Sequence, residues 1–498
     1  MESKSRIIGF LIGLVLIGTA CSPDVEPLRQ GRGENPQETT VQEPSQAPSD
    51  SSSINWSAYL FGPTHSSRNS NTKAITATNA SDLTEEWQWA PEPPSQEGQP
   101  PSQLFASPTV FDGTVYIGVN SGDFYALDEA TGTVRWKQFL GFLEQNESCG
   151  RRGTTSTATV AEDPKTGEPT VYVGAADGNL YALNAASGDT RWKSFVVSPQ
   201  EDGHNWSSPT VMDGRVYVGV ASHCKSTVRG GVKEYDQATG RLLETYWTVP
   251  KGVIGGSVWS SVAAASNGKS IFVSTGNGDL NGGDPGDSFS VVRLKARTLT
   301  KEDIWTAPLE GTDLDFGASP TLFSARINDE TTPMVGACNK NGRFYAFRQK
   351  NLSAGPAWEV EVSGKWPNDG NCLGAAIWDS DRERLFVSGA QTTVDGKSHR
   401  GSIREVNPAT GAFLWELGLP GVVWGSPSMN GNNIIAVPSF DTDPSAERAV
   451  WLIDANDGSM VETLDTADNP VFSQPVFADN YLFVATVGGG LIAYKLEF

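Results

Sequence analysis

The stretch FDGTVYIGVNSGDFYALDEATGTVRW, residues 111–136, contains the pattern that decides the fold. Short apolar runs alternate with turns built on Asp-Gly and Thr-Gly, which is typical of consecutive antiparallel β-strands. The stretch VYVGAADGNLYALNAASGDTRW, residues 171–192, repeats the same order of strand, glycine turn, Tyr-Ala-Leu strand, glycine turn and tryptophan. Self-similarity of this kind predicts a repeat architecture.

Looser copies of this repeat fill the rest of the chain and bring the total to eight. Each copy opens with small residues, as expected for a strand that lies close to the axis of a ring. The eight openings are Ser107-Pro108, Ser156-Thr157, Ser208-Pro209, Ser260-Ser261, Ser319-Pro320, Ala375-Ala376, Ser426-Pro427 and Gln474-Pro475. Most of the tryptophans that end the copies should pack between neighbouring repeats, namely Trp136, Trp192, Trp305, Trp358 and Trp415.

The eighth copy lacks an outermost strand, because the chain stops soon after the strand at residues 491–494. Conversely, the segment from Leu83 to Trp89 reads as a strand that belongs to no repeat. Pairing these two segments closes the ring and protects the sheet edges. The sequence therefore predicts an all-β, eight-bladed β-propeller over residues 55–498, closed by an N-terminal strand.

The N-terminus reads as an export signal. Two basic residues precede an apolar run at residues 7–17, which is about half of the roughly 20 residues that a membrane span needs. Small residues then precede Cys21, and this order resembles a bacterial lipoprotein signal over residues 1–21. Cys21 would be the lipidated first residue, whereas ordinary secretion would cleave near Ala20. Residues 22–54 are rich in Ser, Pro, Gln and Glu and predict a disordered tether on an extracytoplasmic membrane surface.

Composition excludes several classes of protein. The chain has 498 residues, 53 glycines and 30 prolines, which suits a turn-rich β protein and not a helical bundle. The formal charge of −21 argues against nucleic acid as a partner, because it repels phosphate backbones. A single apolar segment excludes a membrane protein with many spans.

Four cysteines remain after Cys21, and an even number in an exported chain favours disulfides. Three pairings are open. We favour Cys149–Cys224 and Cys338–Cys372, because each pair falls in neighbouring repeats. The spacings that signal a zinc ribbon or covalent haem are absent from the sequence.

The repeat phrase Tyr-Ala-Leu-Asp, Thr-Gly, Trp is similar to the tryptophan-docking repeat of the pyrroloquinoline-quinone (PQQ) dehydrogenase superfamily. Residues 55–69 also resemble the segment that opens those dehydrogenases, and the nearest resemblance is to the polyvinyl-alcohol dehydrogenase branch. The repeat is specific for the fold, but non-catalytic propellers share it, including a lipoprotein that scaffolds outer-membrane assembly. Function therefore has to be argued from the site.

The resemblance implies a site built from successive repeats. Trp259 lies in a stretch similar to the one whose tryptophan stacks on PQQ, and Asn277 stands where the family has a calcium-ligating asparagine. Asp315 matches the catalytic aspartate, which makes it both the candidate base and a candidate metal ligand. Lys340 matches a basic residue that contacts the quinone oxygens, and Trp424 matches a later tryptophan at the cofactor.

Each of these residues also has a purely structural interpretation. Asn277 beside a glycine is a common turn residue. Asp315 and Lys340 would be solvent-exposed loop residues, and Trp259 and Trp424 would fill the mouth of the ring.

One stretch departs from the family. Ser222 and Arg229 fit a family segment that contacts the cofactor, but Lys225 stands at the position of a calcium-ligating glutamate. An ammonium removes a ligand and repels Ca²⁺. Either Lys225 replaces the cation as a fixed charge, or the metal site is absent.

Three functions follow. The first is a PQQ-dependent alcohol dehydrogenase of the cell envelope that passes electrons to a separate acceptor. The second is a non-catalytic scaffold, in which the rim of the ring binds an envelope protein or a glycan. The third, a hydrolase, is the least supported, because the chain has four histidines and no nucleophile motif beside them.

Overall fold

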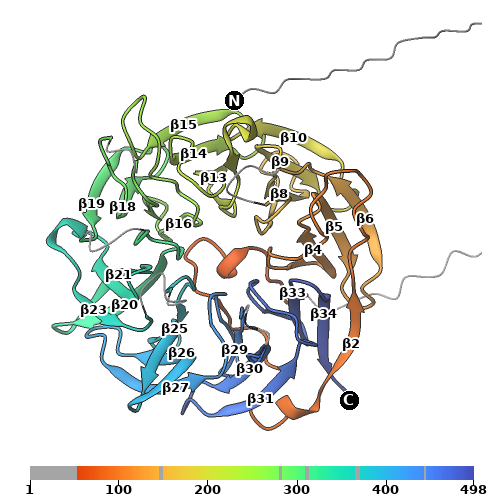
Figure 1. The fold of residues 1–498 in the computed structure, drawn as a ribbon, viewed down its shortest axis with the longest axis vertical. Coiled ribbons are helices and arrows are strands. Elements are labelled where there is room, and N and C mark those ends of the chain that lie inside the picture. The colour runs from red at the N-terminus through yellow and green to blue at the C-terminus, as the bar shows by residue number, and fades with distance from the viewer. Residues whose placement is uncertain are drawn as a thin grey trace, which may run out of the picture. The chain divides into compact units, whose positions relative to one another are not determined.

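The computed structural model describes residues 53–144, 150–279, 283–308, 313–364, 371–441, 443 and 445–497. In this part of the chain the strands form eight sheets around one axis, and the only helices are four short 3₁₀ turns (Figure 1). None of these helices is long and apolar enough to cross a membrane. The predicted eight-bladed propeller is confirmed. The predicted signal, with Cys21, and the predicted tether as far as residue 52 lie outside the described residues.

The first four blades each contain four strands in the order of the sequence, from the axis outwards. Blade 1 contains β3 (Thr109–Phe111), β4 (Thr114–Gly118), β5 (Asp123–Asp128) and β6 (Val134–Phe139). Blade 2 contains β7 (Thr159–Glu162), β8 (Pro169–Gly174), β9 (Asn179–Asn184) and β10 (Thr190–Phe195). Blade 3 contains β12 (Thr210–Met212), β13 (Arg215–Ser222), β14 (Gly231–Asp236) and β15 (Leu242–Trp247), with β11 (Gly203–His204) added beside β13. Blade 4 contains β16 (Ala263–Ala264), β17 (Ser270–Ser274), β18 (Ser290–Lys295) and β19 (Lys301–Thr306).

The other four blades follow the same plan, except that two of them recruit N-terminal strands. Blade 5 contains β20 (Thr321–Ile327), β21 (Glu330–Cys338), β22 (Arg343–Arg348) and β23 (Trp358–Glu361). Blade 6 contains β24 (Ile377–Asp379), β25 (Arg384–Val394), β26 (Lys397–Val406) and β27 (Phe413–Leu419). Blade 7 contains β28 (Ser428–Asn430), β29 (Ile434–Pro438), β30 (Ala449–Asp454) and β31 (Met460–Asp465), with β1 (Arg68–Asn69) parallel to β28. Blade 8 contains β32 (Val476–Ala478), β33 (Tyr481–Thr486), β34 (Gly490–Leu496) and β2 (Leu83–Trp89).

Strand β2 closes the ring as the sequence predicts. It lies antiparallel to β34, with Leu83 opposite Leu496 and Trp89 opposite Leu491. The last blade therefore combines the start and the end of the propeller, and its outer edge is a strand far away in sequence (Figure 1).

The repeated tryptophans join neighbouring blades. The indole of Trp136 donates to the backbone oxygen of Ala185 in the next blade at 2.9 Å, and its ring covers Gly188. A Cβ at Gly188 would lie 2.6 Å from that ring, so only glycine fits there. Trp87, Trp192, Trp358 and Trp415 make the same pair of contacts with the next blade. Trp305 instead packs on Tyr345 and Phe347 of blade 5, so all five predicted tryptophans pack between blades.

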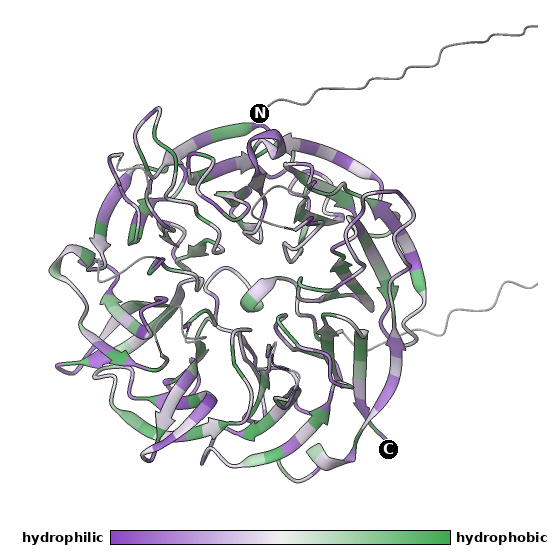
Figure 2. Ribbon diagram, in the orientation of Figure 1, coloured by the Kyte–Doolittle hydropathy of each residue, from purple (hydrophilic) through white to green (hydrophobic). Residues whose placement is uncertain are grey.

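The apolar residues lie mainly in the inner strands of each blade, while the outermost strands are more hydrophilic (Figure 2). The clusters of buried residues confirm this arrangement, because each cluster joins strands of adjacent blades. The core is therefore divided into layers between blades.

Residues 54–68 fill the centre of the ring, where Figure 1 shows the red end of the described chain. The backbone of Trp56 both donates to and accepts from Val110 of β3, at 2.9 Å each. The same segment accepts backbone hydrogen bonds from blades 4 to 7. This contact with the inner strands around the ring gives the central channel a floor.

Candidate functional site

A cavity of about 460 Å³ opens on the axis of the propeller, and we call it the funnel. Its walls come from loops that leave the outermost strand of one blade for the next, and from loops between the second and third strands. Tyr59 of the central segment also lines it. Because both kinds of loop lie at the same end of every blade, residues distant in sequence meet there.

Six of the residues predicted for the site line the funnel: Ser222, Trp259, Asn277, Asp315, Lys340 and Trp424. They come from blades 3 to 7 and from the loops between them. The family motifs that follow one another along the sequence therefore meet in one cavity.

Lys340 and Asp315 form the charged centre of the funnel. The ammonium of Lys340 lies 2.7 Å from Oδ1 of Asp315 and 2.8 Å from Oδ1 of Asp313. The Asp315 side chain is only 3% exposed and that of Lys340 only 14%, so neither is an exposed loop residue. Burial lowers the pKa of Lys340, but the charges of Asp315 and Asp313 outweigh it and the pKa lies above its ordinary value. Lys340 is therefore a fixed positive charge.

Trp259 lies against this centre. Its indole N–H donates to Oδ2 of Asp315 at 3.1 Å, and the Lys340 ammonium lies 5.2 Å from the centroid of its ring. Gly317 lets the ring approach the backbone, because a Cβ there would lie 2.5 Å from the indole. The loop sequence Asp-Phe-Gly thus lets the indole of Trp259 approach a buried carboxylate with its N–H edge.

Two buried polar atoms near this centre have no hydrogen-bond partner among the described residues. They are Oδ1 of Asn277 and Nε1 of Trp424. The amide of Asn277 donates to Asp313 at 2.6 Å, which fixes its orientation. Trp424 stacks on Phe440 with centroids 5.6 Å apart. Because buried polar atoms are normally paired, these two can bind a polar ligand.

The stretch from Ser222 to Arg229 is only partly in the funnel. The Ser222 hydroxyl accepts hydrogen bonds from the backbone N–H groups of Thr227 and Val228, so it shapes the loop. Arg229 does not line the funnel; it donates to the backbone oxygen of Val249 and covers the ring of Trp247. Lys225 is exposed and also lies outside the lining, although Cys224 and Ser226 belong to it. The Lys225 side chain is therefore not part of the funnel lining.

The described side chains do not fit a calcium ion well. Across these residues, no group of three or more His, Cys, Asp or Glu side chains is arranged to hold a metal. The carboxylates of Asp313 and Asp315 are already paired with the Lys340 ammonium. Ca²⁺ prefers six to eight oxygen ligands, and here an internal cation occupies the two strongest ones.

The funnel lining also contains residues that were not predicted from the sequence. Arg152 covers Phe105, with its guanidinium 4.8 Å from the ring centroid, and Trp206 stacks on His223. Arg152 follows Cys149 closely, and Trp206 lies in the loop before a predicted inner strand, so position within the repeat was the available signal. The propeller geometry is what brings them to the same cavity as Lys340.

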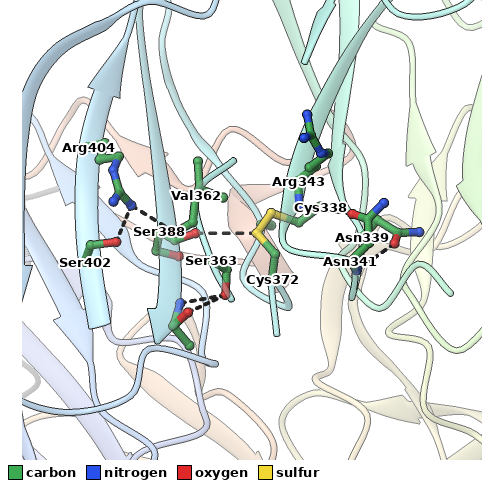
Figure 3. The surroundings of a disulfide bond; sticks show 12 residues. Cys338, Asn339, Asn341, Arg343, Val362, Ser363, Cys372, Ser388, Ser402 and Arg404 are labelled. Atoms are coloured by element: carbon green, nitrogen blue, oxygen red, sulfur yellow. Dashed lines mark hydrogen bonds between the residues drawn. A yellow bond between two sulfur atoms is a disulfide. The ribbon is translucent and has the colours of Figure 1, made fainter. Parts of the chain in front are cut away.

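One predicted disulfide is present. Cys338 at the end of β21 is bonded to Cys372 before β24, with 5.2 Å between their Cα atoms (Figure 3). Cys224 is also disulfide-bonded, whereas Cys149, its predicted partner, lies outside the described residues. The bond between Cys338 and Cys372 fixes two segments of the wall, because Lys340 and Leu373 adjoin it and line the funnel.

Two protein families whose members contain β-propellers match parts of this chain. Residues 56–363, more than half of the chain, match the family described as glucose/ethanol/alcohol dehydrogenase, beta-propeller domain. The chain belongs to this family. Residues 399–497 match a second propeller family, described as outer membrane protein assembly factor BamB.

Individual relatives are distant. A quinohemoprotein alcohol dehydrogenase, ADH IIB, of Pseudomonas putida is 25% identical over 460 residues, covering 79% of this chain and 64% of the relative. The polyvinylalcohol dehydrogenase of a Sphingopyxis strain is 24% identical over 53% of this chain and 45% of its own length. Among solved structures, a europium-containing methanol dehydrogenase superposes with a TM-score of 0.71 at 15% identity, covering 89% of this chain and 98% of that one. The resemblance to the PQQ dehydrogenase superfamily is thus confirmed, and the chain spans just under two thirds of the length of the Pseudomonas relative.

Proposed function

We propose that this protein is an extracytoplasmic, quinoprotein-like oxidoreductase that binds PQQ in the funnel and oxidises an alcohol. The observation that carries the proposal is the joining of Trp259, Asp315 and Lys340 in one cavity at the axis. An aromatic face, a carboxylate and a fixed cation are what a quinone-dependent alcohol oxidation requires of a protein.

The residues present fit PQQ, which is a flat aromatic quinone carrying carboxylates. The funnel volume of about 460 Å³ lies in the usual range for a small-molecule site. Trp259 offers a ring for stacking, and Lys340 and Arg152 offer positive charge in the funnel lining. The unpaired atoms of Asn277 and Trp424 add hydrogen-bonding capacity.

When bound, PQQ would supply the acceptor for the two electrons of the alcohol. The chain's own residues would do the rest. Asp315 would accept the hydroxyl proton of the substrate, and the indole of Trp259 holds its carboxylate in position. Lys340 would stabilise negative charge in the funnel. Since the donors do not fit Ca²⁺ well, the proposed reaction gives no role to a metal.

The setting of the reaction is part of the same proposal. Electrons would leave to a separate acceptor protein or quinone. The signal at residues 1–21 would lead to lipidation at Cys21, and residues 22–54 would tether the propeller to a membrane of the cell envelope.

The test uses the purified full-length chain with PQQ, ethanol or 1-butanol, and a phenazine dye as electron acceptor. We expect PQQ-dependent dye reduction. Asp315→Asn should lower the turnover at least about 100-fold, whereas Asp329→Asn at an exposed turn should not change it. Failure of the folded chain to reduce the dye with PQQ, over a range of alcohols and with Ca²⁺ added, would contradict the proposal.

A further inference from the structure

Two buried histidines that the proposed reaction does not use lie at the funnel, and one of them, His223, lines it. His204 is 1% exposed and His223 is 4% exposed. Strand β11 holds them together, because His204 lies opposite Ala221 of β13 and the backbone of His223 donates to Asp202 at 2.7 Å. Their ring centroids lie 5.5 Å apart.

In each imidazole one ring nitrogen has a hydrogen-bond partner, and the other has none among the described residues. Nε2 of His204 lies 2.8 Å from the hydroxyl of Thr155, a half-buried residue of the funnel lining. Nδ1 of His223 lies 3.2 Å from Oδ1 of Asp202, whose side chain is 16% exposed. The remaining nitrogens, Nδ1 of His204 and Nε2 of His223, are buried and have no hydrogen-bond partner in the described part of the chain.

These contacts form a chain from Thr155 through His204 and His223, which itself also lines the funnel, to the partly exposed Asp202. Its one gap lies between the two imidazoles, whose ring centroids are 5.5 Å apart, and the relay needs one bridging water molecule there. The Asp202 carboxylate accepts the Nδ1 proton of His223, which leaves Nε2 as a proton acceptor. Burial lowers the pKa of both histidines, and the charge of Arg152 adds to this, while Asp202 partly opposes it for His223. Neutral imidazoles of this kind can pass a proton on without retaining it.

The chemistry of the funnel needs such a path. Oxidation of R–CH₂OH to R–CHO releases two electrons and two protons; the electrons leave with the external acceptor. The protons also have to leave a largely buried site. We propose that Thr155, His204, His223 and Asp202 form a proton relay that carries protons from the funnel to solvent. This inference rests on the proposed function for its purpose, but the relay itself can be measured without it.

The first experiment uses ¹⁵N NMR of the histidine side chains in the full-length chain without PQQ. We expect neutral His223 to carry its proton on Nδ1, and His223→Gln to shift the titration of His204. His399→Gln, on the distant strand β26, is the matched control and should leave the His204 titration unchanged. A proton on Nε2 of His223, or independent titration of the two imidazoles, would overturn the relay whether or not PQQ binds.

The second experiment measures turnover of the PQQ-loaded chain with ethanol and a phenazine dye. His223→Gln, His204→Gln and Asp202→Asn should each lower kcat at least about tenfold with little change in KM, and should increase the solvent deuterium isotope effect. His399→Gln should behave as the wild type. If PQQ binds and these variants turn over at the wild-type rate, the relay is wrong while the proposed function stands. If no activity appears at all, the proposed function fails and the NMR result alone decides the relay.

Discussion

At the scale of single residues, Lys340 is the centre of the charged contacts in the funnel. Its ammonium is shared between Asp313 and Asp315, and it lies over the face of Trp259. Because the ion pair is buried, removal of the lysine would leave two uncompensated carboxylates. The ammonium thus compensates the two carboxylates and holds together the loops that carry them.

Glu129 is another buried acid, and it lies where strand β2 meets blade 1. Glu129 is 5% exposed, and burial together with the charge of Asp479 raises its pKa from 4.5 to about 8. Asp479 in turn accepts a hydrogen bond from the backbone of Ile54. Between pH 4.5 and about pH 8 the folded chain retains a proton on Glu129 that the unfolded chain has lost. The free energy of unfolding therefore decreases as the pH rises through this range.

Glu129→Gln removes this proton uptake, and we therefore expect it to stabilise the protein at alkaline pH. At pH 8 the free energy of unfolding should exceed that of the wild type by about 1–4 kcal/mol, and at pH 4 the two should agree. Thermal unfolding across this pH range measures the difference. Glu330→Gln, at an exposed strand end, serves as the control. A constant difference between Glu129→Gln and the wild type would refute the raised pKa.

At the scale of elements, strand β2 determines whether the ring stays closed. Trp87 of this strand donates to the backbone oxygen of Glu129 at 3.0 Å and covers Gly132 of blade 1. Trp87→Ala should destabilise the protein by about 3–5 kcal/mol, because it removes a large side chain from the junction. Trp247→Ala, at a 37% exposed position of β15, should cost less than about 1 kcal/mol. Urea unfolding of both variants tests this, and equal losses would contradict the role of β2.

The disulfide between Cys338 and Cys372 joins blade 5 to the loop that enters blade 6 (Figure 3). The two cysteines are 34 residues apart in sequence, so on the chain-entropy view the bond stabilises the fold by roughly 4 kcal/mol. The double variant Cys338→Ala, Cys372→Ala should lower the unfolding temperature and also weaken PQQ binding, since Lys340 lies two residues from Cys338. Calorimetry and a PQQ titration measure the two effects. Unchanged binding would show that the disulfide does not position Lys340.

The sequence predicted the strands and their closure because both depend on local patterns. The repeated glycine turns and the unpaired segment from Leu83 to Trp89 are visible without coordinates. The candidate site was predicted only in part. Asp313, Arg152 and His223 meet the funnel through blade geometry, and only their position within the repeat could have pointed to them. Arg229 matched a family motif, but the ring of Trp247 holds it outside the funnel.

At the scale of the whole molecule, the propeller acts as a frame that gathers loop residues around one axis. The central segment at residues 54–68 gives the channel a floor, and the loops at the other end form the funnel. One end of the ring is thus stabilised by backbone pairing, while the other end carries the polar side chains. The proposed proton relay begins at the lining of the same cavity that would hold the proposed chemistry.

The most direct test of this account is a PQQ titration of the full-length chain, followed by quenching of tryptophan fluorescence. We expect one PQQ to bind per chain, with affinity at least about tenfold weaker in Lys340→Met. Lys225→Met should bind as the wild type, because Lys225 lies outside the funnel lining. Absence of binding to the folded chain, or equal loss in the two lysine variants, would contradict the central claim that this funnel is a quinone site.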